Sequence, residues 1–241
     1  MSVMEKLSFV MGAILIVLHI SCSSSPTSSV ATEGRIKISI RGVNGASSNT
    51  LSKSMSFVTI TSARVVIDEI EFESSTEDSV DFEFDEPFVQ DLSVDSTLHE
   101  ITTVQVPFGI YEEMEIEIDK LDEEDGAVFT QNPELQYLSI RVEGFLNDDT
   151  ANTFVFTSDL SAEQETEFEP PLVIDETTPS TNVVLTIDMG MWFVDNNNNP
   201  VDPRLEDNRN IIESNIKASI KVFEDDDDDG ERDDDDDDDD D

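Results

Sequence analysis

Residues 114–119 read MEIEID and residues 35–40 read RIKISI, and these two stretches decide the fold class. In the first, Met114, Ile116 and Ile118 alternate with acidic side chains; in the second, three isoleucines alternate with polar residues. A period of two is typical of a β-strand that buries one side and exposes the other. The alternation therefore predicts strands with an apolar inner face.

Comparable runs cover 57–72, 80–84, 101–108, 137–146, 153–157, 167–174, 182–193 and 216–223, with turn residues between them. Within 57–72 the apolar phase changes near Asp68, which indicates a bulge or a strand that changes sheets. Residues 205–215 are the one helix candidate. Many short strands separated by turns favour an all-β fold, an antiparallel β-sandwich of the immunoglobulin or transthyretin-like kind.

The charge is strongly acidic, with 57 Asp and Glu against 13 Lys and Arg in 241 residues, a net charge of -44. Nucleic acids and anionic lipid headgroups require clustered basic side chains, so the net charge argues against both as partners. It favours divalent cations or cationic partners. Adaptation to a salty medium explains the same charge without a partner.

The N-terminus has the form of an export signal. Residues 7–20 are mostly apolar but too few for an ordinary membrane-spanning helix, and Cys22, the only cysteine, follows. Ser21-Cys22 resembles the lipobox of bacterial lipoproteins, although His19 replaces the usual leucine. The resemblance implies a signal peptide over 1–21, a lipid on Cys22, a flexible tether over 22–33, and export to the outer membrane or cell surface. The alternative is a plain secretory signal.

The remaining boundaries follow from composition. We expect the sandwich domain to cover 34–223, with a second small unit from about Tyr137 left open. Residues 224–241 are almost entirely acidic and are expected to form a disordered tail.

A family resemblance covers about Gly34–Leu121. The segments SARVVIDEIEFES, EPFVQDLSV and HEITTVQVPFGIYEEMEIEIDKL place a Pro-x-Gly-x-Tyr turn (Pro107, Gly109, Tyr111) before a strongly alternating strand. This order resembles the bacterial lipoprotein domain catalogued as domain of unknown function 4382. The resemblance implies an exported β-sandwich and implies no catalytic residues.

The sequence predicts a protein that is not an enzyme. After signal removal His99 is the only histidine, no G-x-S-x-G elbow is present, and Cys22 is assigned to the lipid. His99 is expected to be an ordinary surface or edge-strand residue. A secreted hydrolase that uses paired carboxylates stays open as an alternative, because the chain has many acids from which to choose.

Two stretches could bind Ca²⁺, although no cofactor is required. Asp195, Asn197, Asn199 and Glu206 occupy positions 1, 3, 5 and 12 of an EF-hand-like loop, but Pro200 replaces the turn glycine. Asp225, Asp227, Asp229 and Glu231 fit the start of a second such loop. Any aspartate run before a glycine matches that pattern, so diffuse binding of divalent cations is the narrower expectation.

Three aromatic residues are candidates for stacking on glycans, namely Trp192, Tyr111 and Tyr137. Core packing or a turn corner is the favoured role for each. The predicted function is therefore a lipid-anchored envelope protein with a binding or structural role. A carbohydrate-binding or adhesive module is the alternative, and a glycan or another envelope protein is the corresponding partner.

Overall fold

The computed structural model describes residues 33–43, 57–75, 81–93 and 98–225. These residues contain twelve β-strands, two α-helices and three short 3-10 helices. The strands are β1 Glu33–Val43, β2 Val58–Ile67, β3 Glu69–Ser74, β4 Phe82–Phe84, β5 Phe88–Leu92, β6 Leu98–Pro107, β7 Gly109–Ile118, β8 Ile140–Leu146, β9 Asp149–Ser158, β10 Ala162–Ile174, β11 Ser180–Asp188 and β12 Ile220–Glu224. The helices are η1 Glu123–Asp125, α1 Gly126–Gln131, η2 Met189–Met191, η3 Glu206–Asn208 and α2 Arg209–Ala218. The predicted all-β class is confirmed.

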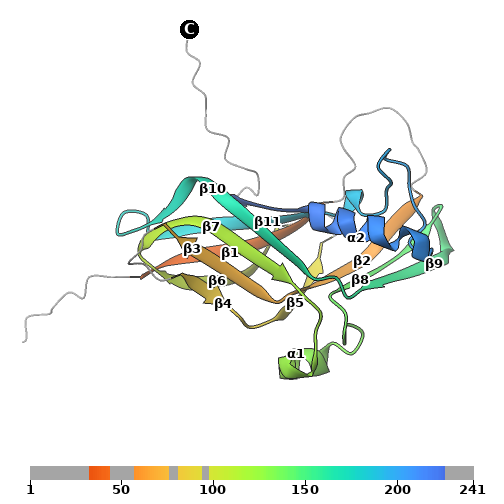
Figure 1. Cartoon of the computed structure of the whole chain (residues 1–241), viewed down its shortest axis with the longest axis horizontal. Helices are drawn as coiled ribbons and strands as arrows, with labels where there is room; N and C mark the ends of the chain where they lie inside the picture. Colours follow the sequence, from red (N-terminus) through yellow and green to blue (C-terminus); the bar gives the residue numbers. More distant parts are fainter. Residues whose placement is uncertain (1–32, 44–56, 76–80, 94–97, 226–241) are drawn as a thin grey trace, which may run out of the picture. The chain divides into compact units, whose positions relative to one another are not determined.

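The strands form three four-stranded sheets (Figure 1). We call them the β1 sheet (order β12-β11-β1-β6), the β7 sheet (β10-β7-β3-β4) and the β8 sheet (β5-β2-β8-β9). The expectation of a purely antiparallel fold is wrong for one pair, because β1 and β11 run parallel. A parallel pair needs a long crossover, which the chain between Val43 and Ser180 supplies. Side-chain alternation within a strand carries no information about the direction of its neighbour.

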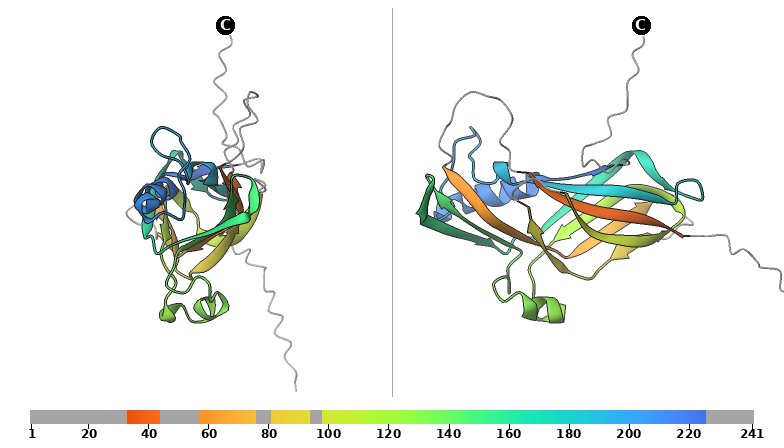
Figure 2. Two further views of the ribbon diagram at one scale, coloured as in Figure 1. Left: turned by 90° about the vertical axis from the view of Figure 1, so that its right-hand side faces the viewer. Right: turned by 180° about the vertical axis from the view of Figure 1, so that it is seen from behind.

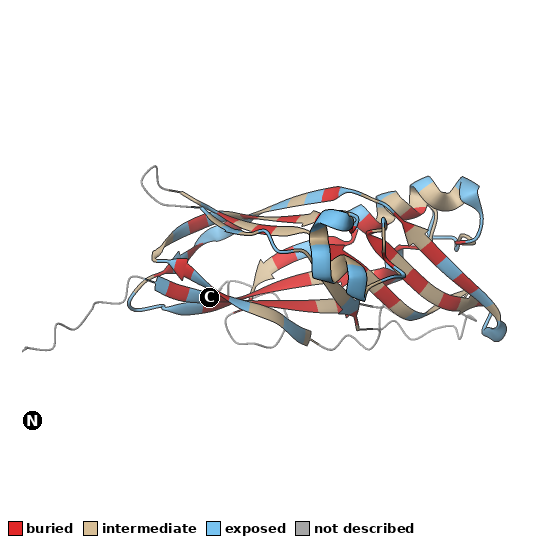
Figure 3. Ribbon diagram, turned by 90° about the horizontal axis from the view of Figure 1, so that it is seen from below, coloured by how far each residue is buried: buried red, intermediate tan, exposed pale blue. Residues whose placement is uncertain are grey.

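The β1 and β7 sheets bury their apolar sides against a common core. Figure 1 has β3 and β7 toward the viewer, and the rear view in Figure 2 has β1 and β6 toward the viewer. Ile36 and Ile38 from β1 join Phe72 from β3 and Met114 from β7 in one cluster, each with no exposed surface. Figure 3 shows the resulting alternation of buried and exposed residues along the strands. The arrangement is sandwich-like.

The predicted change of sheet near Asp68 is confirmed. β2 ends at Ile67 in the β8 sheet, and β3 begins at Glu69 in the β7 sheet. The Asp68 amide donates to the carbonyl oxygen of Glu117 at 2.8 Å. One nearly continuous segment therefore links two sheets, which is why the apolar phase reverses there.

The helix expected over 205–215 is present as η3 followed by α2. Ile212 and Ile216 of α2, four residues apart, belong to the main hydrophobic core. The sequence did not predict the short helix α1. The strand predicted over 182–193 ends at Asp188, whose carboxylate accepts a hydrogen bond from the Gly190 amide at 2.9 Å. None of the helices in the described part of the chain is long and apolar enough to cross a membrane.

The C-terminal end of the fold lies beyond the expected limit at Phe223. β12 extends to Glu224, and the Asp225 side chain has no exposed surface. Residues on both sides of Tyr137 share the same sheets, because β8 pairs with β2 and β10 pairs with β7.

Candidate cation-binding face

Glutamates occupy successive outward positions on three adjacent strands of the β7 sheet. The central strand β7 places Glu117 between Glu69 and Glu163, as the first row of the array. The next two rows follow in the same register. They are Glu71, Glu115 and Glu165, and then Glu73, Glu113 and Glu167. We call these three rows the glutamate face.

The apolar residues on the other side of the same strands fix this register. Ile70, Met114 and Ile116 alternate with the glutamates and are at most 1% exposed. A shift of one residue would move the glutamates into the core and the isoleucines into water. Hydrophobic burial therefore holds the carboxylates in register, although like charges directly opposite each other destabilise a sheet.

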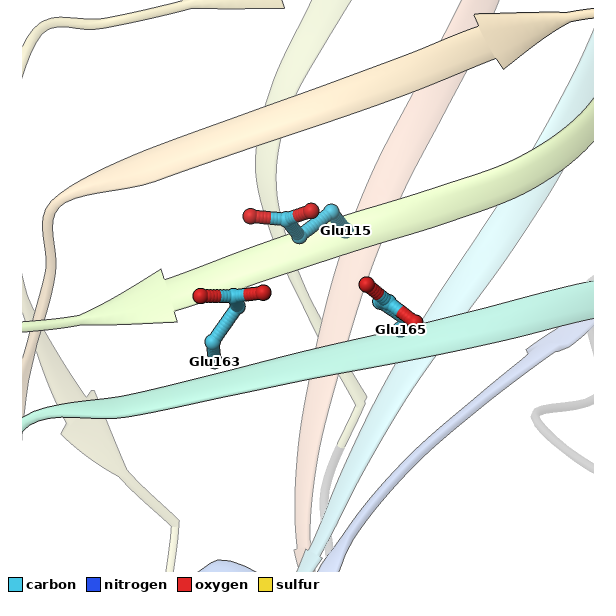
Figure 4. A group of neighbouring side chains, drawn as sticks. All are labelled: Glu115, Glu163 and Glu165. Atoms are coloured by element: carbon cyan, nitrogen blue, oxygen red, sulfur yellow. The ribbon is translucent and has the colours of Figure 1, made fainter.

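The carboxylates approach each other closely at the centre of the face. One oxygen from each of Glu115, Glu163 and Glu165 lies within 4.8 Å of the others. Figure 4 shows Glu115 on β7, and Glu163 and Glu165 on the neighbouring β10. Glu115 is half-buried and the other two are exposed. Ca²⁺ binds carboxylate oxygens at 2.3–2.6 Å with flexible geometry, so small rotations of these side chains would give it two or three ligands.

The electrostatics of the face oppose ionisation. Partial burial raises the pKa of Glu115, and the negative charges of Glu163, Glu71 and Glu165 raise it further. The pKa of Glu113 is raised in the same way, by burial first and then by Glu165 and Glu73. A divalent cation placed among these carboxylates would offset the repulsion that the fold imposes.

A pocket of about 390 Å³ lies at one end of the face. The register between β7 and β3 shifts between Glu73 and Ser74, and the register between β7 and β10 shifts between Glu167 and Leu172. The lining combines carboxylates with two apolar residues: Glu73, Ser74, Glu112, Glu113, Glu167, Phe168, Glu169 and Pro171. A concave site with several acids exists, so the carboxylate-based hydrolase stays a prediction.

In the EF-hand-like loop after η2, the Asp195 carboxylate stabilises the turn by accepting hydrogen bonds from within the loop. Asp195 accepts hydrogen bonds from the backbone amides of Asn197 and Asn199, each at 2.8 Å, and from the Asn199 side chain. The Asn199 side chain, followed by the two amides, lowers the pKa of Asp195. Glu206 instead pairs with Arg209 at 3.1 Å. The loop brings Asp195, Asn197 and Asn199 together, but no hydrogen bond within the described residues joins Glu206 to them.

Of the predicted lipidation residue and the predicted C-terminal metal ligands, only Asp225 lies in the described part of the chain. Asp225 belongs to the fold, because its Oδ2 accepts a hydrogen bond from the Asn182 Nδ2 at 3.0 Å and its side chain is buried. The expectation that Asp225 belongs to an exposed tail is therefore wrong. Asp227, Asp229, Glu231 and Cys22 lie outside the described residues.

Two of the three aromatic candidates for glycan stacking are core residues. Trp192 is 1% exposed and donates from Nε1 to the Ser219 Oγ at 2.9 Å. Tyr111 is equally buried, and its hydroxyl donates to the Pro107 carbonyl at 2.8 Å, which makes it a corner of the turn before β7. Tyr137 is 52% exposed and contacts Phe129 edge-on. His99 is an exposed residue of β6.

The glutamate face had a sequence signal that the search for calcium loops missed. EIEFE at 69–73, EMEIE at 113–117 and EQETE at 163–167 all place glutamate at every second position. Each segment alone indicates only a strand with an acidic outer side. Their meeting depends on the β3-β7-β10 strand order, which no local pattern reveals.

The comparisons with known proteins found no family model, no curated protein and no solved structure that matches this chain. The resemblance to domain of unknown function 4382 therefore stays a prediction.

Proposed function

We propose that this protein binds divalent cations, Ca²⁺ above all, on the glutamate face of an exported, lipid-anchored domain. The observation that carries the proposal is the register that aligns three rows of glutamates across β3, β7 and β10. Solvation alone would be served by scattered charges. An aligned array keeps its carboxylates close enough to share an ion.

Ca²⁺ suits this face better than Mg²⁺. Mg²⁺ requires near-ideal octahedral geometry and loses its water reluctantly, whereas Ca²⁺ accepts six to eight oxygens in flexible arrangements. The oxygens of Glu115, Glu163 and Glu165 are within 4.8 Å of each other, and water would complete the coordination. An open site of this kind predicts a Kd on the order of 10⁻⁴–10⁻³ M, the range of extracellular calcium modules.

The sequence supplies the cellular context of the proposal. Lipid attachment at Cys22 and export to the outer membrane or cell surface rest on the resemblance of the N-terminus to a lipoprotein signal. The immunoglobulin or transthyretin-like arrangement is likewise a proposal, which the sandwich-like sheets and the Tyr111 corner support. We propose a binding role rather than a catalytic one, since no nucleophile with a histidine base was found in the sequence.

Calorimetric titration of the full chain with Ca²⁺ tests the proposal. The test variant replaces the central row, Glu71→Gln, Glu115→Gln and Glu165→Gln. The control variant replaces three exposed glutamates elsewhere, Glu86→Gln, Glu124→Gln and Glu176→Gln, so that both lose the same charge. We expect the row variant to lose the binding component with a Kd on the order of 10⁻⁴–10⁻³ M and the control to retain it, whereas diffuse binding by the aspartate-rich residues 225–241 should be the same in both. Equal losses in both variants would show that only total charge matters and would sink the proposal.

A further inference from the structure

Basic residues gather on the outward side of the β1 sheet, away from the glutamate face. Arg35, Lys37 and Arg41 alternate with the buried isoleucines of β1. Arg41 stands opposite Thr186 on β11, and Thr186 stands opposite Lys221 on β12. We call Arg35, Lys37, Arg41 and Lys221 the basic face. In a chain with a net charge of -44, such a cluster is a strong local exception.

Several other basic residues of the described chain have carboxylate partners. Arg64 pairs with Asp91 and Glu134, Arg204 pairs with Asp202, and Arg209 pairs with Glu206 and Glu213.

Arg35, Arg41 and Lys221 differ, because none of them forms an ion pair with a described residue. The Arg41 Nε is buried and has no hydrogen-bond partner within that part of the chain. Arg35 and Lys221 are exposed, so their charges are accessible to an anionic partner.

The same side of the sheet is more buried than a solvated strand face would be. Ser39 is 1% exposed, Asn182 is 5% exposed and Val184 has no exposed surface, although all three point outward beside the basic residues. Val184 belongs to neither of the two hydrophobic clusters. Because these three side chains are already covered, a docking segment would contact the exposed Arg35 and Lys221 and the half-buried Lys37 and Arg41 instead.

The chain itself brings an anionic segment to this surface. The Asp225 amide donates to the Asn182 carbonyl at 3.0 Å, and Asn182 lies opposite Lys37. The Asn182 side chain links Asp225 to Ser39, because it donates to the Asp225 carboxylate and accepts from the Ser39 hydroxyl at 3.1 Å. The chain is therefore attached to the basic face at its last described residue, and residues 226–241 continue from there with thirteen aspartates, one glutamate and one arginine.

We propose that the basic face is a docking surface for the chain's own acidic segment, residues 226–241. At about 3.3 Å per residue the segment can extend about 50 Å, whereas a four-stranded sheet is about 15 Å wide. Attachment at Asp225 keeps the segment at a high effective concentration beside the four cations, so weak individual contacts add up. Salt above the physiological range weakens such docking by screening.

Zero-length carbodiimide cross-linking of the full chain tests the proposal, because it joins carboxylates to lysines that they contact. Arg232 allows trypsin to separate residues 233–241 from the residues next to β12. Cross-links from peptide 233–241 to Lys37 therefore report docking of the distal segment. Lys120 and Lys217, both exposed and outside the basic face, are internal references.

We expect the Lys37 cross-link to exceed those at Lys120 and Lys217 by about five-fold at low salt, and to fall to their level at about 0.5 M NaCl. Arg35→Gln with Lys221→Gln, both exposed positions, should reduce the Lys37 cross-link about five-fold. The matched control, Lys120→Gln with Lys217→Gln, should leave it unchanged. Similar yields at the three lysines, or equal losses in the two variants, would overturn the proposal. An intermolecular Lys37 cross-link, seen as a dimer band, would overturn docking within one chain.

Discussion

Glu115→Gln should stabilise the protein when divalent cations are absent, because it removes the centre of a repelling array. Carboxylate oxygens of Glu163 and Glu165 lie within 4.8 Å of one on Glu115. Two unit charges at that distance in water repel by about 0.9 kcal/mol, and screening over a Debye length of about 8 Å leaves about 0.5 kcal/mol. Two such pairs give a gain of about 1 kcal/mol, which raises the Tm of a domain of this size by about 2–4 °C.

Thermal unfolding followed by circular dichroism, first in a chelator and then in Ca²⁺, measures the Tm without divalent cations and the increase in Tm that Ca²⁺ causes. A ligand that binds only the folded state stabilises it, so Ca²⁺ should raise the Tm of the wild type more than that of Glu115→Gln. Glu176→Gln removes one exposed glutamate outside the face and should change neither value. A destabilised Glu115→Gln protein, or a Ca²⁺ shift equal to that of the wild type, would refute the reasoning.

Three further predictions rest on the structure, and a fourth rests on the N-terminal sequence. The raised pKa values of Glu113 and Glu115 mean that the folded state holds more protons than the unfolded state just above the ordinary glutamate pKa, so the free energy of unfolding should increase as the pH falls from 7 toward about 5. Below the ordinary aspartate pKa of about 3.9 the free energy of unfolding should decrease again, because Asp195 and Asp202 have lowered pKa values and lose their hydrogen-bonded ionised form. Urea unfolding across this pH range measures both effects, and a flat profile from pH 7 to 5 would contradict the predicted increase. Tyr111→Phe removes the hydrogen bond to Pro107 and should cost about 1 kcal/mol in urea unfolding, and an unchanged midpoint would show that this corner contributes nothing. Trp192→Phe removes the bond to Ser219 and leaves a void, with an expected cost of about 2 kcal/mol, whereas a glycan-binding role would leave stability intact and abolish sugar binding. Cys22→Ala should abolish palmitate labelling and move the protein from the detergent phase to the aqueous phase, and persistence in the detergent phase would contradict lipid anchoring.

The strands could be predicted because their burial repeats every second residue. RIKISI lies within β1, the first five residues of MEIEID lie within β7, and the phase change at Asp68 marks the passage between two sheets. The strand β5 was missed, since the adjacent apolar pair Phe88-Val89 and the adjacent polar pair Gln90-Asp91 give FVQDL no alternation. The helix α1 was missed because it spans only Gly126–Gln131, too few residues for a helical period.

The glutamate face and the basic face could not be predicted, because both depend on strand order. Glu71 and Glu115 are 44 residues apart in sequence, Glu115 and Glu165 are 50 apart, and their alignment follows only from the β3-β7-β10 order. The meeting of Arg41 and Lys221 across Thr186 likewise requires the parallel pairing of β1 with β11. Sequence reasoning directed attention to calcium loops with recognisable spacing, whereas the structure uses Asp195 to stabilise its own turn.

A crystal of the protein grown with Tb³⁺, a Ca²⁺ substitute with a strong anomalous signal, tests the central claim most directly. We expect an anomalous peak among the carboxylates of Glu115, Glu163 and Glu165, and a weaker or absent peak when Glu115→Gln is crystallised under the same conditions. Ions bound at the Asp195 loop, with none on the glutamate face, would contradict that claim.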